Sequence, residues 1–377
     1  CSRYLNFVAW SNINKAKKGE DEMKRVMLVL MVLTLAAGLV LTGCGGSQKS
    51  PAAGNQQTSA GGSQQSSNAG STDKLTIRYG SADAEDAAIV QGIFAFKEYV
   101  EKASGGSIIV ETYINGVLGG DRELAEALQL GTVDMTVVLG GILANYDPAL
   151  NIFSLPYLFQ TKQATYDAVD GEFGETLAKR IEAINFKLMG WGDGGTYQVA
   201  NSVRPVTSLE DIKGIKIRVP EIEADIEFFK AAGASPIPIS FSETFTSLEQ
   251  GVVDGLELPV ELMYASRLME PVKYLTLTGH SESIFPVLMS MKLWNKLTPD
   301  QQKIVMDGMK VQIETNRELA QEAETKYIEE FKKMGGEVHV LTDAARQEFI
   351  KVGKQIQERF APNVGTDLIE LAKSFNK

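Results

Sequence analysis

Strand and helix patterns alternate along the chain from Leu75 onward, and this alternation restricts the fold more than any other feature. Leu75, Ile77 and Tyr79 alternate with polar residues, which is typical of a strand with one buried face. A helical pattern follows, and then come a strand over 108–113, a helix over 121–130 that ends at Gly131, and a buried strand over 133–139. Strands separated by helices usually run parallel. The chain is therefore expected to form a largely parallel α/β sheet covered by helices.

The same pattern recurs further along the chain. The run Leu-Gln-Leu-Gly-Thr-Val-Asp at 128–134 is echoed by Leu-Glu-Gln-Gly-Val-Val-Asp at 248–254. Each run reads as the end of a helix, a glycine in a left-handed cap and the entry to a strand. A second unit is predicted from a strand over 216–219, a helix over 221–232 and an extended segment over 235–238. The sequence therefore predicts two lobes built from similar units.

One predicted helix is much longer than the others. The run Thr298-Pro299-Asp300-Gln301 combines an N-cap threonine, proline at the first helical position and glutamine three residues after the cap. The helical pattern continues to Met334, where two glycines end it. A helix of this length is roughly 50 Å long at 1.5 Å per residue. We expect it to lie across both lobes.

The N-terminal part of the chain resembles a bacterial lipoprotein signal. A basic pair precedes an apolar run over 26–40, which is shorter than the roughly 20 residues that span a bilayer, and small residues lead to Cys44. We expect residues 1–22 to be an upstream, non-native segment with Met23 as the true start, and residues 23–43 to be a signal peptide. Residues 44–73 are expected to be a flexible tether. An uncleaved membrane anchor is the alternative. The signal predicts an extracytoplasmic protein anchored to the cell membrane by a lipid on Cys44.

Composition excludes several classes of function. The chain has 37 basic and 48 acidic residues, a net charge of −11, which argues against a nucleic-acid partner. Cys1 and Cys44 are its two cysteines, so no disulfide or thiolate metal site is expected after processing. The sequence has two histidines and no Gly-x-Ser-x-Gly motif. We therefore expect a protein that is not an enzyme, with no cofactor and no metal ligands.

The segment Asp211–Pro220, with the sequence Asp-Ile-Lys-Gly-Ile-Lys-Ile-Arg-Val-Pro, resembles the signature of the solute-binding proteins of TRAP transporters, the dicarboxylate-type (DctP) family. The resemblance covers essentially Leu75 to the C-terminus. Further motifs match in the same order: Gly120-Asp121-Arg122, Gly131–Asp134, Asn201–Pro205, Pro236–Pro238, Phe241–Glu243, Val253–Gly255 and Thr278–His280.

The resemblance implies a two-lobed, periplasmic-binding-protein-like α/β fold of type II-like topology, with hinge strands and a long helix that spans both lobes. It places residues 74–195 and 285–323 in lobe I, and residues 196–284 and 324–377 in lobe II. It also implies capture of a small carboxylate between the lobes and delivery to TRAP integral membrane subunits. A ligand-sensing protein that docks on a signalling receptor, and an ABC-type substrate-binding lipoprotein, stay open as alternatives.

The resemblance assigns the ligand carboxylate to Arg218. Pro220 ends the strand pattern two residues after Arg218, so the side chain of Arg218 can face the space between the lobes. A guanidinium group fits a carboxylate through two parallel hydrogen bonds. The alternative is a structural arginine paired with a nearby glutamate. Phe241 matches a family position that packs on the ligand, with lobe core as its alternative.

Two departures from the family pattern change the expected ligand. Where many relatives have a second arginine, Tyr197 or Gln198 stands here, and Leu258 replaces a common asparagine. We infer a ligand with one carboxylate and a partly apolar body. The other candidates each have a structural alternative: Trp191 as core, Asp83 and Asp121 as acids at helix N-termini, and Glu257 as half of a structural pair.

Overall fold

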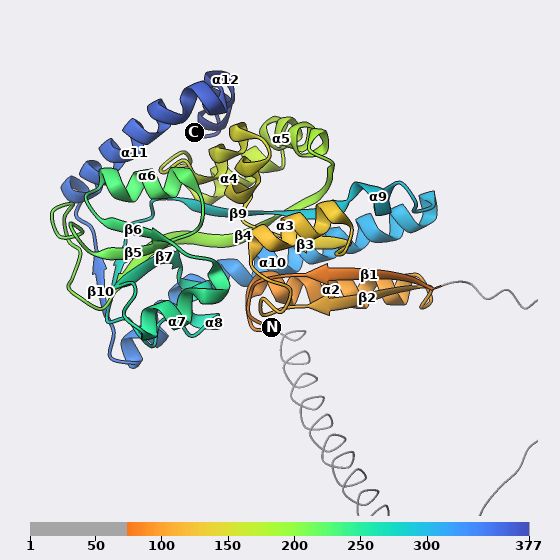
Figure 1. Cartoon of the computed structure of the whole chain (residues 1–377), viewed down its shortest axis with the longest axis horizontal. Helices are drawn as coiled ribbons and strands as arrows, with labels where there is room; N and C mark the ends of the chain where they lie inside the picture. The colour runs from red at the N-terminus through yellow and green to blue at the C-terminus, as the bar shows by residue number, and fades with distance from the viewer. Residues whose placement is uncertain (1–73, 377) are drawn as a thin grey trace, which may run out of the picture. The chain divides into compact units, whose positions relative to one another are not determined.

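The computed structural model describes residues 74–376 (Figure 1). The predictions for residues 1–73, which include the signal peptide, the tether and the lipid on Cys44, lie outside the described residues. Within residues 74–376, no helix combines the length and the apolar character needed to cross a membrane.

The elements follow one another in an α/β order. They are β1 (Leu75–Gly80), α2 (Ala88–Ala103), β2 (Ile108–Tyr113), α3 (Asp121–Leu130), β3 (Met135–Val137), η1 (Gly140–Asn145), η2 (Pro148–Ser154), α4 (Lys162–Val169), α5 (Glu172–Ala183), β4 (Phe186–Asn201), β5 (Lys216–Val219), α6 (Glu223–Ala231), β6 (Ser235–Pro238), η3 (Phe241–Glu243), α7 (Thr244–Glu249), β7 (Gly255–Pro259), α8 (Val260–Ala265), β8 (Tyr274–Leu277), β9 (Glu282–Ser290), α9 (Met291–Trp294), α10 (Pro299–Lys333), β10 (Glu337–Val340), α11 (Asp343–Val364) and α12 (Thr366–Lys373).

Two groups of parallel strands make up the two lobes. In lobe I, β1 pairs in parallel with β2 and β3, and in lobe II, β5 pairs in parallel with β6 and β7. The antiparallel strands β9 and β4 join these groups along the path β2-β1-β3-β9-β4-β7-β5-β6. β8 and β10 form a further parallel pair beside β4. Figure 1 shows the two lobes on either side of the region where β4 and β9 run together. The two-lobed α/β prediction is confirmed, although its connecting strands are antiparallel.

β4 belongs to both lobes. Its residues 186–196 pair with β9, and its residues 197–201 pair with β7 and β8. A β-bulge lies between Asp193 and Gly195, and Gly195 has φ +96°, which disfavours any side chain. The strand is therefore irregular just before it passes from one lobe to the other. The sequence analysis did not predict this strand as a unit, because its glycine-rich centre hides the alternation of a strand.

α10 lies across both lobes, as predicted. Its N-terminus has the expected capping box, in which Thr298 and Gln301 satisfy each other's backbone N–H groups. The helix packs on α2 of lobe I and on α8 of lobe II. Gly92 permits the close approach of α2, because a Cβ there would lie 2.8 Å from the carbonyl oxygen of Gln312.

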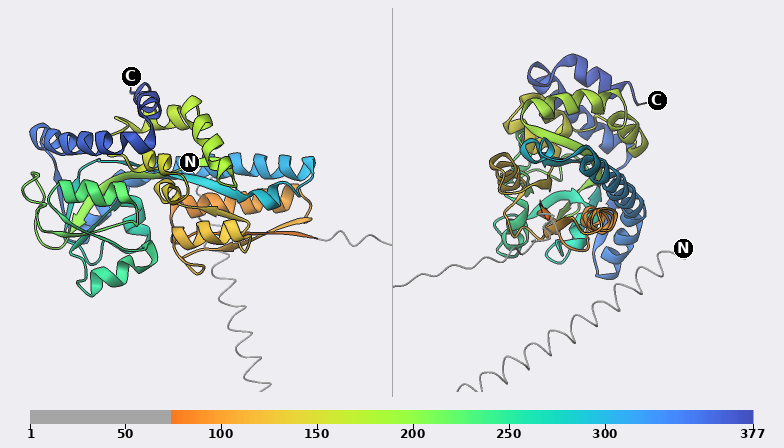
Figure 2. Two further views of the ribbon diagram at one scale, coloured as in Figure 1. Left: turned by 45° about the horizontal axis from the view of Figure 1, so that its top comes forward. Right: turned by 90° about the vertical axis from the view of Figure 1, so that its right-hand side faces the viewer.

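The C-terminal helices contact more than one part of the fold. α11 packs on α6 of lobe II and also on η2, and α12 packs on α5. Figure 2 shows them running along one side of the molecule to the C-terminus. The sequence analysis placed the whole of residues 324–377 in lobe II, and these contacts extend beyond that lobe. The reason is that an amphipathic pattern predicts a buried face but not the surface that buries it.

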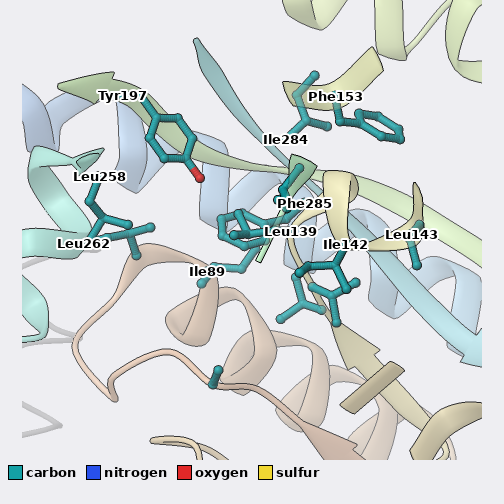
Figure 3. Packing of buried hydrophobic residues seen from close by; sticks show 14 of the residues in the cluster. Ile89, Leu139, Ile142, Leu143, Phe153, Tyr197, Leu258, Leu262, Ile284 and Phe285 are labelled. Atoms are coloured by element: carbon teal, nitrogen blue, oxygen red, sulfur yellow. The ribbon is translucent and has the colours of Figure 1, made fainter. Parts of the chain in front are cut away.

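Apolar side chains from both lobes come together where the lobes meet. Figure 3 shows Ile89, Leu139 and Ile142 of lobe I facing the region of Tyr197 and Leu258. All five residues are buried, and each exposes at most 8% of its surface. A continuous apolar core therefore reaches from the lobes into the region between them.

Candidate ligand-binding site

Arg218 is buried at the end of β5, in the central strand of the parallel group of lobe II. It exposes 1% of its surface, and its Nε donates a hydrogen bond of 2.9 Å to the carbonyl oxygen of Ile239. Its guanidinium carbon lies 5.9 Å from the centre of the Phe241 ring, within range of a cation–π contact. The remaining guanidinium N–H groups have no hydrogen-bond partner among residues 74–376. A buried cation with unused donors strongly favours an anionic partner.

Groups from both lobes surround this guanidinium. Burial lowers the pKa of Arg218, whereas Tyr197, Glu257, Asp121 and Asp225 act in the opposite direction because their negative charge would stabilise the cation. Asp121 is in the first turn of α3 in lobe I, whereas Asp225 is on α6 in lobe II. The structure therefore brings Arg218, Phe241, Tyr197, Glu257 and Asp121 together.

Two carboxyl groups of lobe I, those of Asp83 and Asp121, lie close to each other, and that of Asp121 lies near Arg218. Asp83 is buried and accepts a hydrogen bond of 2.9 Å from the hydroxyl of Ser81, and burial raises its pKa to about 6. Asp121 is half-buried as a residue, but burial of its carboxyl group and the proximity of Asp83 raise its pKa to about 8. At neutral pH Asp121 is thus largely uncharged, and both groups can exchange hydrogen bonds with hydroxyl groups.

Glu257 is held by a buried hydrogen-bond chain. Its Oε2 lies 2.7 Å from Nε2 of His280, whose Nδ1 lies 2.8 Å from the hydroxyl of Thr278. Burial lowers the pKa of His280 to about 3 and raises the pKa of Glu257, so the contact is not an ordinary ion pair at neutral pH. Among the described residues, Oε1 of Glu257 is buried without a partner. The structural pair that the sequence left open is therefore present, and it fixes Glu257 while leaving one oxygen available.

Tyr197 and Gln198 occupy opposite sides of β4. Tyr197 acts to raise the pKa of Arg218, and burial raises the pKa of the Tyr197 hydroxyl well above its ordinary value, with a smaller contribution in the same direction from Glu257. Gln198 instead bonds to Glu324 of α10 and to the backbone of Gly279. Leu258 stands directly opposite Gln198 in the β4–β7 ladder and is buried. Of the two residues that replace the family's second arginine, Tyr197 is the one beside Arg218.

Trp191 lies in the core of lobe I. Its ring centre is 5.5 Å from that of Phe153, and its carbonyl oxygen accepts a hydrogen bond from Arg317. The sequence left Trp191 as either a ligand contact or a core residue, and the structure places it in the core.

Direct contacts close the space between the lobes, and the sequence analysis missed most of them. The carboxylate of Glu261 on α8 accepts a hydrogen bond of 2.8 Å from the backbone N–H of Ala88 at the start of α2. Gly120 of lobe I lies against Ser240 of lobe II, and a Cβ at Gly120 would lie 2.3 Å from the serine hydroxyl and would force that side chain to move. No motif marks Glu261 or Asp225, because their importance depends on how the lobes meet.

The described residues contain no group of three or more His, Cys, Asp or Glu side chains placed to hold a metal ion.

The chain resembles known proteins over most of its length. The family model "Bacterial extracellular solute-binding protein, family 7" (DctP) matches residues 79–363. A solute-binding protein of Verminephrobacter eiseniae is 32% identical over 299 residues, which cover 79% of this chain and 89% of the relative. The C4-dicarboxylate-binding periplasmic protein DctP of Rhodobacter capsulatus is 29% identical over 307 residues, 80% of this chain and 91% of the relative.

Solved structures show the same fold. The sugar acid binding protein DctPAm of Advenella mimigardefordensis, in complex with galactonate, superimposes with a TM-score of 0.78 at 28% identity, covering 80% of this chain and 99% of that chain. A TRAP periplasmic solute-binding protein of Sulfurospirillum deleyianum with bound succinate gives a TM-score of 0.77 at 27% identity, with the same coverage. The chain therefore belongs to the DctP family of bacterial extracellular solute-binding proteins that serve TRAP transporters.

Proposed function

We propose that this protein captures a small organic acid between its lobes and binds the carboxylate of that acid through Arg218. The observation that carries the proposal is a buried guanidinium group whose only hydrogen bond to a described residue uses Nε. A carboxylate supplies two acceptors in the geometry of the unused N–H groups. Phe241 covers one side of the guanidinium, and the buried Tyr197 contributes aromatic surface nearby. Because Arg218 is enclosed, a ligand can enter only after the lobes separate.

We further propose a ligand with one carboxylate and several hydroxyl groups. Four acidic side chains lie around the one cation, Arg218: Glu257, Asp121, Asp225 and Asp83. A second carboxylate on the ligand would therefore face carboxyl groups, charged or protonated, and no second cation among them. Hydroxyl groups can donate to these oxygens, including the unpaired Oε1 of Glu257. Relatives whose ligands are galactonate and D-erythronate support this chemistry, whereas others hold succinate.

A thermal-shift screen of the full chain tests this proposal. Galactonate, erythronate and glucuronate should raise the unfolding temperature more than succinate does, and galactitol, which lacks the carboxylate, should have no effect. A ligand present at 100 times its dissociation constant stabilises a protein by roughly 2.7 kcal/mol. If succinate gives the largest shift, the polyhydroxy assignment is wrong. If no organic acid stabilises the protein, the capture of carboxylates is wrong as well.

Delivery to TRAP membrane subunits is the role that family membership supports best. A signalling receptor and an ABC transporter are the competing partners, because capture of the ligand would be the same in all three cases. Genes for TRAP membrane subunits beside the gene of this protein would support transport. A neighbouring gene for a sensor kinase or for an ABC permease would contradict it.

We propose that the protein is anchored outside the cytoplasm by a lipid on Cys44. The apolar run and the small residues before Cys44 support this proposal. Cys44→Ser should abolish incorporation of radiolabelled palmitate and leave the precursor unprocessed on a gel. Ser50→Ala, in the segment that follows Cys44, is the control and should not change labelling. Equal labelling of the Cys44→Ser variant and the wild type would refute the anchor.

A further inference from the structure

Three chain segments connect the two lobes. The first is β4 around Gly194–Thr196, the second is residues 278–281 between β8 and β9, and the third is α10, which packs on α2 of lobe I and on α8 of lobe II. Figure 1 shows α10 passing along β4 and β9 where the lobes meet. Any separation of the lobes must bend all three segments.

On the side of lobe I, Asn316 fixes α10 to β4. Its Oδ1 accepts a hydrogen bond of 2.7 Å from the N–H of Asp193, and its Nδ2 donates one of 2.9 Å to the carbonyl oxygen of the same residue. Asn316 is fully buried. The carboxylate of Asp193 in turn accepts bonds from Lys162, Tyr166 and the N–H of Gly195 at the bulge. One end of the bending region is thus firmly held.

On the side of lobe II, one side chain contacts all three segments. Gln198 belongs to β4, its Oε1 accepts a hydrogen bond of 2.9 Å from the N–H of Gly279, and its Nε2 donates one of 3.0 Å to the carboxylate of Glu324 on α10. Gln198 exposes 3% of its surface. The amide group matches both partners, because a flipped amide would set donor against donor and acceptor against acceptor.

We propose that Gln198 is a positioning residue that ties the three connecting segments together at lobe II, so that they bend as one unit when the lobes open and close. Bending is then confined to the stretch between the two anchors, namely Gly194–Thr196 of β4 and about two turns of α10 between Asn316 and Glu324. Neither of the two hydrogen bonds of Gln198 involves Arg218 or the acids around it. The inference rests on the proposed opening of the lobes, but the contacts themselves do not depend on the identity of the ligand.

Hydrogen exchange of the ligand-free full chain, followed by mass spectrometry, tests this role. Gln198→Leu should speed exchange about tenfold or more in three separate regions, the β4 segment around 194–198, residues 278–282 and the α10 segment 317–324, because a buried hydrogen bond to a charged group is lost. Glu324→Leu should speed exchange in the same three regions. Glu324→Gln keeps an oxygen that accepts from Nε2, so its pattern should remain close to that of the wild type.

Thr136→Val is the matched control. Thr136 is fully buried on β3 of lobe I, and its hydroxyl donates a hydrogen bond of 3.0 Å to the carbonyl oxygen of Gly80, away from the three segments. Its loss should speed exchange only near that contact. The proposal is overturned if Gln198→Leu affects the amide of Gly279 but leaves residues 317–324 unchanged, since Gln198 would then be a local structural residue. It is equally overturned if Gln198→Leu and Thr136→Val accelerate exchange uniformly through the fold.

Discussion

Replacing Arg218 with alanine is expected to weaken ligand binding by about 3–5 kcal/mol, the cost of breaking a buried ion pair. The effect is large because the carboxylate would lose its charged partner while it remains enclosed among Glu257, Asp121 and Asp225. Arg218→Lys should also bind poorly, since an ammonium group cannot form two parallel bonds and its shorter side chain cannot keep the contact with Ile239. Isothermal titration calorimetry with the best acid from the thermal-shift screen measures the loss.

Arg267→Ala is a suitable control for this experiment. Arg267 is a surface residue of lobe II that pairs with Glu270 at 2.7 Å, and its loss should leave affinity unchanged. Unfolding by urea should be measured in parallel, so that misfolding of the Arg218 variants is recognised. Wild-type affinity in a correctly folded Arg218→Ala protein would remove Arg218 from the binding site.

The contribution of Asp121 to the stability of the ligand-free protein should fall as pH rises from about 4 to about 8, and Asp121→Asn should remove this contribution. The pKa of Asp121 is raised from 3.8 to about 8, so between these values the native protein holds a proton that the unfolded chain has lost. The stabilisation is complete below the lower pKa and is lost as pH rises through the higher one. One pKa unit corresponds to 1.36 kcal/mol. Because Asp121 is half-buried, we expect about 1–3 kcal/mol across the window.

Urea unfolding at about pH 5 and about pH 8 checks this expectation. Asp121→Asn should be more stable than the wild type at the higher pH, because the amide group never loses a proton. Asp86→Asn, an exposed change in the same lobe, should leave the pH dependence unaltered. Part of the slope will remain in the Asp121 variant, since burial also raises the pKa of Asp83 to about 6 and that of Glu261 to about 7. An identical slope in the wild type and Asp121→Asn would contradict the assigned proton.

Many elements of the fold were predictable because their signals are local. α3 begins and ends at the predicted residues, Gly131 adopts φ +76° as a left-handed cap, and α10 begins with the predicted capping box. Caps, turns and periodicity depend on residues a few positions apart, so one sequence is sufficient to detect them. The same applies to the Arg-Val-Pro segment that identified Arg218 as a candidate.

The composition of the site could not be predicted in the same way. The sequence could not decide between Tyr197 and Gln198, because neighbouring residues of a strand face opposite sides and the sequence does not show which side meets Arg218. It gave no sign of Asp225 or Glu261, whose roles depend on contacts between lobes that are distant along the chain. It left Trp191 undecided, since core and ligand pocket both select aromatic residues.

The sequence by itself therefore determined the two α/β units and the long helix, and it identified the arginine that we propose binds an acid, because these follow from local patterns and from one motif. The tertiary structure alone decided which groups surround that arginine and how Gln198 joins the segments between the lobes. The physical reason is that burial, proton affinity and coupling depend on distances in space, and the packing of one lobe on the other sets those distances.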